Sequence, residues 1–218
     1  MIILNIKLED IEKAIVAGGN DWEMQNNTLD RKTKFIYYVD NFDTLKLLCN
    51  TTLSQEKDRQ YAYHRWANFC SSIYCEQLFC KYGAEKVNNL KDKEKDIYID
   101  NIPYDVKLTV YPTTTAVKYD LRTEEGKEGM IRWFYNNQSN EGRQHYKNRI
   151  FIVCGGKTQE ERMKNKIRFL SIEEAIKKWI IERFSKGGIF RKGWSRVQSL
   201  LRYNIHQIKW YVKPFLSD

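Results

Sequence analysis

An alternation of apolar and polar residues in two neighbouring segments, 95–100 and 104–110, constrains the fold more than any other feature. Successive side chains of a strand point to opposite faces of a sheet, so alternation separates two faces. One face receives the apolar residues Ile97, Ile99, Val106, Leu108 and Val110. The other receives Asp96, Tyr98, Asp100, Asp105, Lys107 and Thr109. The pattern predicts two strands that present one core face and one polar face.

The predicted strands pair most simply as a hairpin that turns at Ile102-Pro103. In that register Asp100 lies opposite Asp105, and their carboxylates repel each other unless a cation lies between them. Carboxylate oxygens suit hard ions such as Mg²⁺ or Mn²⁺. The alternative is a solvated face of an edge hairpin, whose charges only discourage edge-to-edge pairing.

A helix predicted from Tyr61 to Tyr82 places a carboxylate in its apolar stripe. Glu76 lies three residues after Ile73 and four before Cys80, on the face that should be buried. An unpaired buried charge is costly, so we expect a metal ion or a cationic neighbour to compensate it. The alternatives are that Glu76 lies at the edge of the stripe or that Gln77 shares the position.

The order of Glu76, Asp96 and Asp105-Val106-Lys107 resembles the PD-(D/E)XK nuclease superfamily, the restriction-endonuclease-like fold. The resemblance covers about residues 61–154. Lys95 stands where the family has its proline, and Asp105 stands where glutamate is more common. The resemblance implies an α/β fold with an αβββαβ core, in which a central mixed β-sheet is flanked by helices.

The same resemblance implies a catalytic site made of Glu76, Asp96, Asp105 and Lys107. The three carboxylates and the backbone carbonyl of Val106 would bind Mg²⁺ or Mn²⁺, and Lys107 would orient a metal-bound water or stabilise negative charge. Phosphodiester hydrolysis by a metal-activated water, leaving 5′ phosphates, is the expected reaction. The family pattern favours Asp96 as the first-strand ligand, whereas the simple hairpin register favours Asp100, which we retain as the second choice.

The remaining segments predict a single domain with helical extensions at both ends. Residues 1–54 form an N-terminal extension, with helices at 8–17 and 42–49 and a strand-like run at 34–39. Residues 55–156 form the nuclease-like core, with further elements at 85–88 (strand), 124–138 (helix) and 149–154 (strand). Residues 157–218 form a basic helical C-terminal extension that includes a helix at 194–209.

The charge balance of the chain favours a polyanionic partner. The 37 Lys and Arg exceed the 28 Asp and Glu, for a net charge of +9. Between residues 186 and 213 there are seven basic residues and no acidic one, interleaved with aromatics. The alternative is that these aromatics belong to the core and the charges are solvated. A solvated helix end would equally explain Gln138 and Arg143. The predicted nucleic-acid-binding residues are Gln138, Arg143, Lys186, Arg191, Lys192, Arg196 and Arg202.

Cysteine content and hydropathy indicate a cytoplasmic protein with no membrane segment. The five cysteines are an odd number without metal-site spacing, and we expect small buried hydrophobic residues, with an iron-sulfur cluster as a remote alternative. No apolar run approaches the roughly 20 residues that span a bilayer, and the first residues do not resemble a signal peptide. His64, His145 and His206 lie in no recognisable catalytic spacing.

These patterns predict a Mg²⁺-dependent endonuclease that acts on DNA, with RNA as a substrate and a homodimer as open alternatives. The competing prediction is a non-catalytic nucleic-acid-binding protein with a degenerate nuclease-like fold, in which Lys107 and Asp105 form an internal salt bridge. A third class is a partner-binding subunit of a larger complex.

Overall fold

The computed structural model describes residues 6–20, 26–87, 95–112, 119–138, 149–184 and 208–212. The chain forms two compact units, Met1–Tyr74 and Cys75–Asp218, and helix α4 (Glu56–Lys81) contributes to both. The first unit is helical and the second contains a mixed sheet with helices, so the predicted α/β class is confirmed.

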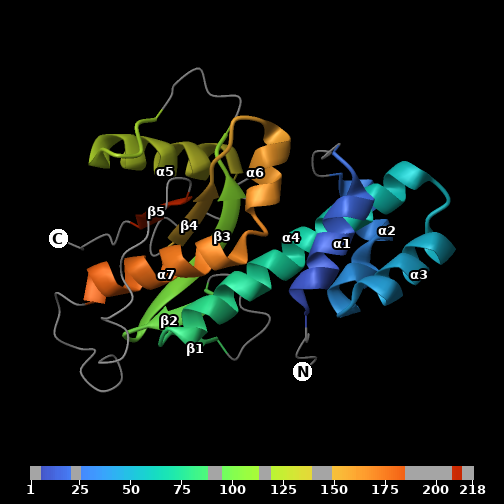
Figure 1. Ribbon diagram of the computed structural model, residues 1–218, viewed down its shortest axis with the longest axis horizontal. Helices are drawn as coiled ribbons and strands as arrows, with labels where there is room; N and C mark the ends of the chain where they lie inside the picture. The colour runs from blue at the N-terminus through green and yellow to red at the C-terminus, as the bar shows by residue number, and fades with distance from the viewer. Residues whose placement is uncertain are drawn as a thin grey trace. The chain divides into compact units, whose positions relative to one another are not determined.

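The C-terminal unit contains a five-stranded sheet in the order β1-β2-β3-β4-β5 (Figure 1). Its strands are β1 (Glu85–Lys86), β2 (Ile97–Ile99), β3 (Ile102–Val110), β4 (Arg149–Cys154) and β5 (Ile208–Val212). Only β3 and β4 pair in parallel, and their connection contains helix α5 (Glu124–Gln138), as a parallel crossover requires. From α4 to β4 the elements follow the predicted order of helix, three strands, helix and strand.

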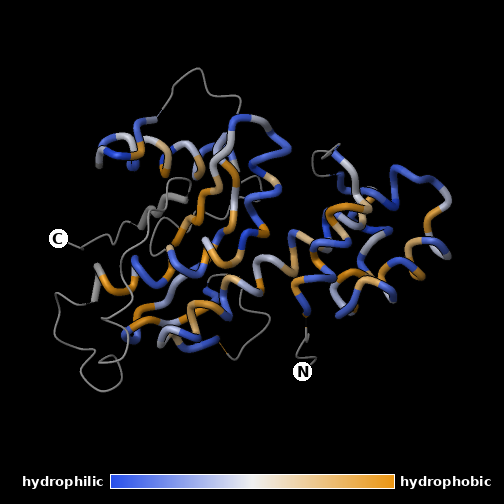
Figure 2. The backbone as a smooth tube through the Cα atoms, viewed as in Figure 1, coloured by the Kyte–Doolittle hydropathy of each residue, from blue (hydrophilic) through white to orange (hydrophobic). Residues whose placement is uncertain are grey.

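The two faces of the sheet are covered by different helices. On one face, Phe134 of α5 stacks on Phe151 of β4, with ring centroids 5.0 Å apart. On the other face, Trp179 of α7 (Phe169–Phe184) contacts the rings of Phe79 and Tyr104 at 6.0 and 6.4 Å. Strand β4 is therefore apolar along most of its length, as Figure 2 shows, because both of its faces are buried.

The hairpin between β2 and β3 turns at Asp100-Asn101, two residues before the predicted turn. Both residues have positive φ, 51° and 63°, which is the geometry of a two-residue primed turn and is tolerated by Asp and Asn. Pro103 instead lies within β3, opposite Tyr98. The predicted register was therefore wrong.

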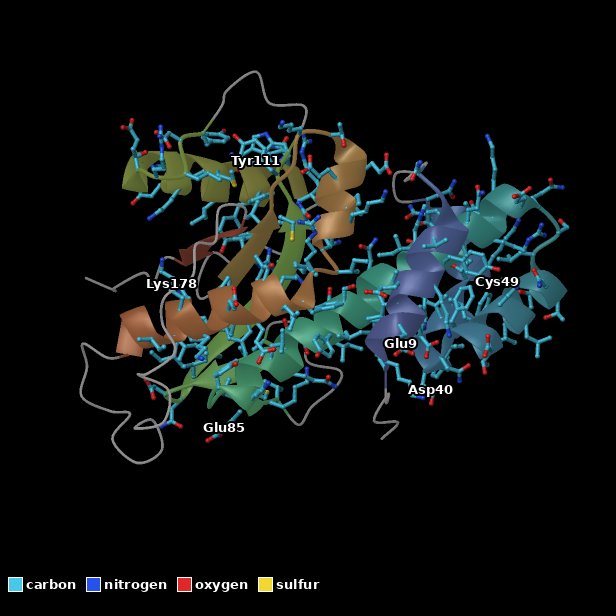
Figure 3. All side chains as sticks on the ribbon, viewed as in Figure 1. Glu9, Asp40, Cys49, Glu85, Tyr111 and Lys178 are labelled. Atoms are coloured by element: carbon cyan, nitrogen blue, oxygen red, sulfur yellow. The ribbon has the colours of Figure 1, made fainter. Side chains whose placement is uncertain are left out.

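The outer strand and the helices after β4 differ in part from the prediction. Strand β1 occupies the predicted position, and its Glu85 is exposed at the sheet edge (Figure 3). After β4 the chain forms the helices α6 (Gln159–Asn165) and α7, whose bounds the sequence did not predict. The helix predicted at 194–209 is wrong at its end, where residues 208–209 belong to β5, and its residues 194–207 lie outside the described ranges.

The N-terminal unit contains α1 (Leu8–Gly18), α2 (Asn27–Lys32), α3 (Phe42–Thr52) and the first part of α4. The helices predicted at 8–17 and 42–49 are confirmed. The strand-like run 34–39 is wrong, because Lys34–Tyr38 form a 3₁₀ helix. Thr33, Ile36 and Val39 are buried at a spacing of three, which matches the three residues per turn of that helix.

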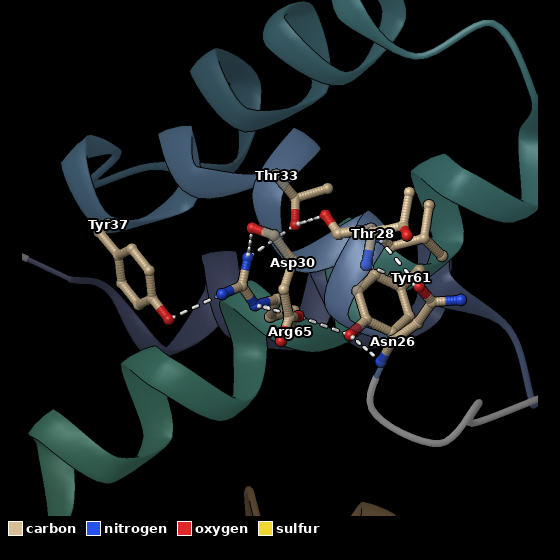
Figure 4. Close-up of polar contacts among 8 residues, drawn as sticks. Asn26, Thr28, Asp30, Thr33, Tyr37, Tyr61 and Arg65 are labelled. Atoms are coloured by element: carbon tan, nitrogen blue, oxygen red, sulfur yellow. Dashed lines mark hydrogen bonds and ion pairs between the residues drawn. The ribbon is translucent and has the colours of Figure 1, made fainter.

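A polar network joins α2, the 3₁₀ helix and α4 in the N-terminal unit (Figure 4). The guanidinium of Arg65 donates to the Asp30 carbonyl at 2.9 Å, the Thr33 hydroxyl at 2.7 Å and the Tyr37 hydroxyl at 2.9 Å. The Tyr61 hydroxyl donates to the Asp30 carboxylate at 2.6 Å. The network supplies hydrogen-bond donors to backbone carbonyl groups in the last turn of α2, where the carbonyl groups of a helix have no partner within it.

Among the described residues, no helix has both the length and the apolar character that a membrane crossing needs.

Candidate active site at the acidic hairpin

Asp96, directly before β2, lies side by side with Asp105 of β3. Because Ile97 pairs with Tyr104, the next position brings Asp96 level with Asp105, and the Asp96 N–H donates to the Tyr104 carbonyl at 2.8 Å. The Asp96 carboxylate in turn accepts the Val106 N–H at 2.7 Å. This backbone bond fixes the orientation of Asp96 at the start of the strand.

The two carboxyl groups are close enough to interact electrostatically. Burial raises the pKa of Asp96 above its usual range, and the adjacent Asp105 adds to the rise. A hydrogen bond between two carboxyl groups requires a proton on one of them. The pair can therefore be held together by one shared proton or, in its place, by a cation.

Asp105 is the better-buried partner and contacts two cations. Its carboxylate lies 3.1 Å from the Lys107 ammonium through Oδ1, and its Oδ2 accepts from the Arg149 guanidinium. Its side chain is 5% exposed, Arg149 is 10% exposed and Lys107 is 48% exposed. Lys107 is thus the cation that solvent or a ligand can reach.

Glu76 is buried on α4 and forms an ion pair with Lys86 of β1. From the sequence we expect either a metal ion or a cationic neighbour to compensate the buried charge of Glu76. In the structure the neighbour is the cationic side chain of Lys86. Burial lowers the pKa of Lys86, and the neighbouring charge of Asp96 opposes that change. Lys86 therefore links Glu76 electrostatically to the aspartate pair.

The structure brings only part of the predicted site together. Asp96, Asp105 and Lys107 adjoin one another, Glu76 is joined to them through Lys86, and Asp100 is exposed in the turn. Within the described ranges, no three Asp, Glu, His or Cys side chains form a group that could hold a metal ion. The metal-ligand roles, including that of the Val106 carbonyl, stay predictions.

The aspartate pair nevertheless suits a hard divalent cation. Mg²⁺ is commonly bound by one or two carboxylates, with water in its other positions. Asp96 and Asp105 provide two adjacent carboxyl groups, and a cation would relieve the repulsion between them when both are ionised. These two residues are the donor set that the geometry offers.

Sequence reasoning missed Lys86 and Arg149. Lys86 is inside the short predicted strand 85–88 and Arg149 begins the predicted strand 149–154, where a charged residue is unremarkable. Arg149 is directly opposite Asp105 in the parallel β3–β4 pairing. That register depends on the whole crossover through α5, so the local sequence carries no signal for it.

Most of the other predicted functional residues lie outside the described part of the chain. Gln138 is the last residue of α5, and its side chain lies outside the described part of the chain, as do Arg143, Lys186, Arg191, Lys192, Arg196 and Arg202. His64 belongs to the N-terminal unit, where its ring contacts the Gly19 carbonyl at 3.0 Å. His145 and His206 also lie outside the described residues.

The five cysteines are free, and all except the half-buried Cys80 are buried, as predicted. Burial raises the pKa of Cys49 and of Cys154 to about 12. Their thiols therefore stay protonated near neutral pH and behave as small hydrophobic groups.

Comparison with protein-family models, with curated proteins and with solved structures found no match to this chain.

Proposed function

We propose that this protein is a metal-dependent endonuclease that hydrolyses phosphodiester bonds in DNA, built on a restriction-endonuclease-like core. The observation that supports it best is the adjacency of Asp96, Asp105 and Lys107 across one hairpin. The strand pairing agrees with this proposal, since an antiparallel β1-β2-β3 ribbon continues into a parallel β4.

In this proposal Asp96 and Asp105 hold Mg²⁺ or Mn²⁺. The ion would supply an activated water and neutralise charge on the scissile phosphate. The Val106 N–H keeps the Asp96 carboxylate oriented toward Asp105. Lys107 is half-exposed, so its ammonium can turn from Asp105 toward the phosphate and stabilise negative charge there.

Glu76 and Lys86 adjoin the proposed site through the charge interaction of Lys86 with Asp96. Their ion pair keeps a positive charge beside Asp96, which favours the ionised carboxylate that a metal ion requires. Glu76 becomes a ligand only if Lys86 releases it. We therefore assign Glu76 a secondary place after the two aspartates.

Five free cysteines support a reducing, cytoplasmic location for this activity. The excess of basic residues supports a nucleic-acid substrate, because a phosphate backbone attracts Lys and Arg without regard to sequence. We keep RNA as an alternative substrate and a homodimer as an alternative assembly.

The direct test is cleavage of linear, nicked, branched and single-stranded DNA with Mg²⁺ or Mn²⁺. We expect the wild type to cut at least one substrate only when metal is present. Asp105→Ala should not cut, whereas Asp100→Ala, on the exposed turn of the same hairpin, should cut like the wild type. Binding without cutting by the wild type would contradict the proposal.

A second candidate is a nucleic-acid-binding protein that does not cut. The specific observation in its favour is charge balance, since Lys86, Lys107 and Arg149 already pair with the acidic side chains of the cluster. In that case Lys107→Ala would weaken DNA binding or stability slightly and change nothing that depends on metal.

A further inference from the structure

We propose that Arg149 is a positioning residue that holds Asp105 in place while it limits the affinity of the site for a divalent cation. This inference rests on the nuclease function proposed above. It concerns a residue that is not part of the motif Glu76, Asp96 and Asp105-Val106-Lys107. It arises from the contacts that strand β4 makes.

Arg149 is fixed on two sides. Its guanidinium donates to Oδ2 of Asp105, directly across the parallel β3–β4 pair. It also lies over the ring of Tyr135 on α5, with the guanidinium carbon 5.6 Å from the ring centroid. Tyr135 in turn contacts Phe151 edge-on at 5.6 Å, so the arginine is held against the core packing of α5 and β4.

The two cations of Asp105 differ in what they can reach. The side chain of Arg149 is 10% exposed, whereas that of Lys107 is 48% exposed. A guanidinium buried between a carboxylate and a tyrosine ring has little access to a DNA phosphate. Arg149 therefore acts on Asp105, and Lys107 is the cation available to substrate.

The contact has two opposed consequences. By engaging Oδ2, Arg149 leaves Oδ1 as the oxygen directed toward Lys107. By placing a positive charge next to the carboxylate, it also repels a second cation that would bind there. Removing the arginine charge should tighten metal binding and, because Asp105 becomes less well placed, slow cleavage.

The test compares Arg149→Met, Arg149→Lys and a control, Arg132→Met. Arg132 is on α5, is 74% exposed and pairs with Glu128 one turn away. For each protein we would measure the Mn²⁺ concentration that gives half of the metal-induced rise in melting temperature. Duplex DNA affinity and cleavage at saturating Mn²⁺ complete the set.

We expect Arg149→Met to need roughly tenfold less Mn²⁺ than the wild type. Its cleavage at saturating Mn²⁺ should be slower by about tenfold or more, with DNA affinity unchanged. Arg149→Lys keeps the charge, so its Mn²⁺ requirement should match the wild type while its cleavage is slowed. Arg132→Met should match the wild type in every measurement.

A folded Arg149→Met with an unchanged Mn²⁺ requirement would overturn the inference. If that variant does not fold, Arg149→Lys decides, because wild-type cleavage by the lysine variant would equally overturn it. A wild type that shows neither a Mn²⁺ response nor cleavage would remove the proposed nuclease itself, which is a different result from either of these.

Discussion

Two regions of this protein pair an aspartate with an arginine, and they differ in burial and in what surrounds the pair. In the N-terminal unit, Asp30 is 3.0 Å from the Arg65 guanidinium and accepts from the Tyr61 hydroxyl. In the C-terminal unit, Asp105 pairs with Arg149 but also adjoins a second carboxyl group, Asp96.

The second carboxyl group beside Asp105 identifies the candidate site better than the aspartate–arginine ion pair does. The contacts of Arg65 tie together backbone and side chains of neighbouring helices, which is a structural task. The adjacent Asp105 adds to the rise in the pKa of Asp96, and two like charges side by side do not stabilise the fold. Perturbed carboxyl groups of this kind are concentrated at functional sites.

Among variants that should keep measurable cleavage, Lys107→Ala has the largest expected effect. If the ammonium stabilises charge at the phosphate, its loss should slow cleavage by about 10²- to 10³-fold. The free energy of unfolding should change by less than about 1 kcal/mol, since the Lys107–Asp105 pair is half-exposed on the lysine side. Lys46→Ala, on the exposed surface of α3, is the matched control.

Arg149→Met and Arg65→Met should both destabilise the protein, so a comparison of the two separates loss of stability from a change in the metal response. Arg149→Met leaves the buried Asp105 without its arginine, and a loss of about 3 kcal/mol in the free energy of unfolding is expected. Arg65→Met acts on the half-buried Asp30, so its loss should be smaller. Only Arg149→Met should change the response of the melting temperature to Mn²⁺. A similar metal response in both variants would remove the distinction between the two regions.

The pH dependence of stability without metal should reveal the raised pKa of Asp96. A carboxyl group whose folded pKa exceeds its unfolded value binds more protons when folded, so its contribution to stability falls as pH rises between the two values. The window begins near the ordinary pKa of 3.8 and extends upward. Denaturant unfolding should show wild type losing stability relative to Asp96→Asn across that window; parallel curves would contradict the assignment.

The smallest effect is expected for Asp100→Asn. Asp100 is in the hairpin turn at φ 51°, and asparagine accepts that conformation equally well. Stability should change by less than about 0.5 kcal/mol, as is usual for surface substitutions, and cleavage should be unchanged. Loss of cleavage would make Asp100, not Asp96, the functional aspartate.

Much of the sheet unit was predictable from local patterns. The bounds of α5 and β4 match the predicted ranges 124–138 and 149–154, because a helical stripe and an uninterrupted apolar run are strong signals. The predicted turn is misplaced because proline favours turns, whereas Asp100-Asn101 fits a primed turn better. That error alone moved Asp100 into the position that Asp96 occupies.

The rest required the tertiary structure. Residues 34–39 have the composition of a strand, but they are adjacent to helices and bury every third residue. The contact of Arg149 with Asp105 depends on a parallel register set by a crossover of nearly forty residues, as the positions of β3 and β4 show. No local pattern encodes that pairing.

The measurement that tests the central claim most directly is Mn²⁺ binding, followed by electron paramagnetic resonance without DNA. Wild type, Asp96→Asn and Asp30→Asn would be compared at the same pH. The account predicts that wild type and Asp30→Asn bind Mn²⁺ and that Asp96→Asn binds it far more weakly. No binding by the wild type, or undiminished binding by Asp96→Asn, would contradict the claim that the carboxyl pair of the sheet unit is a metal site.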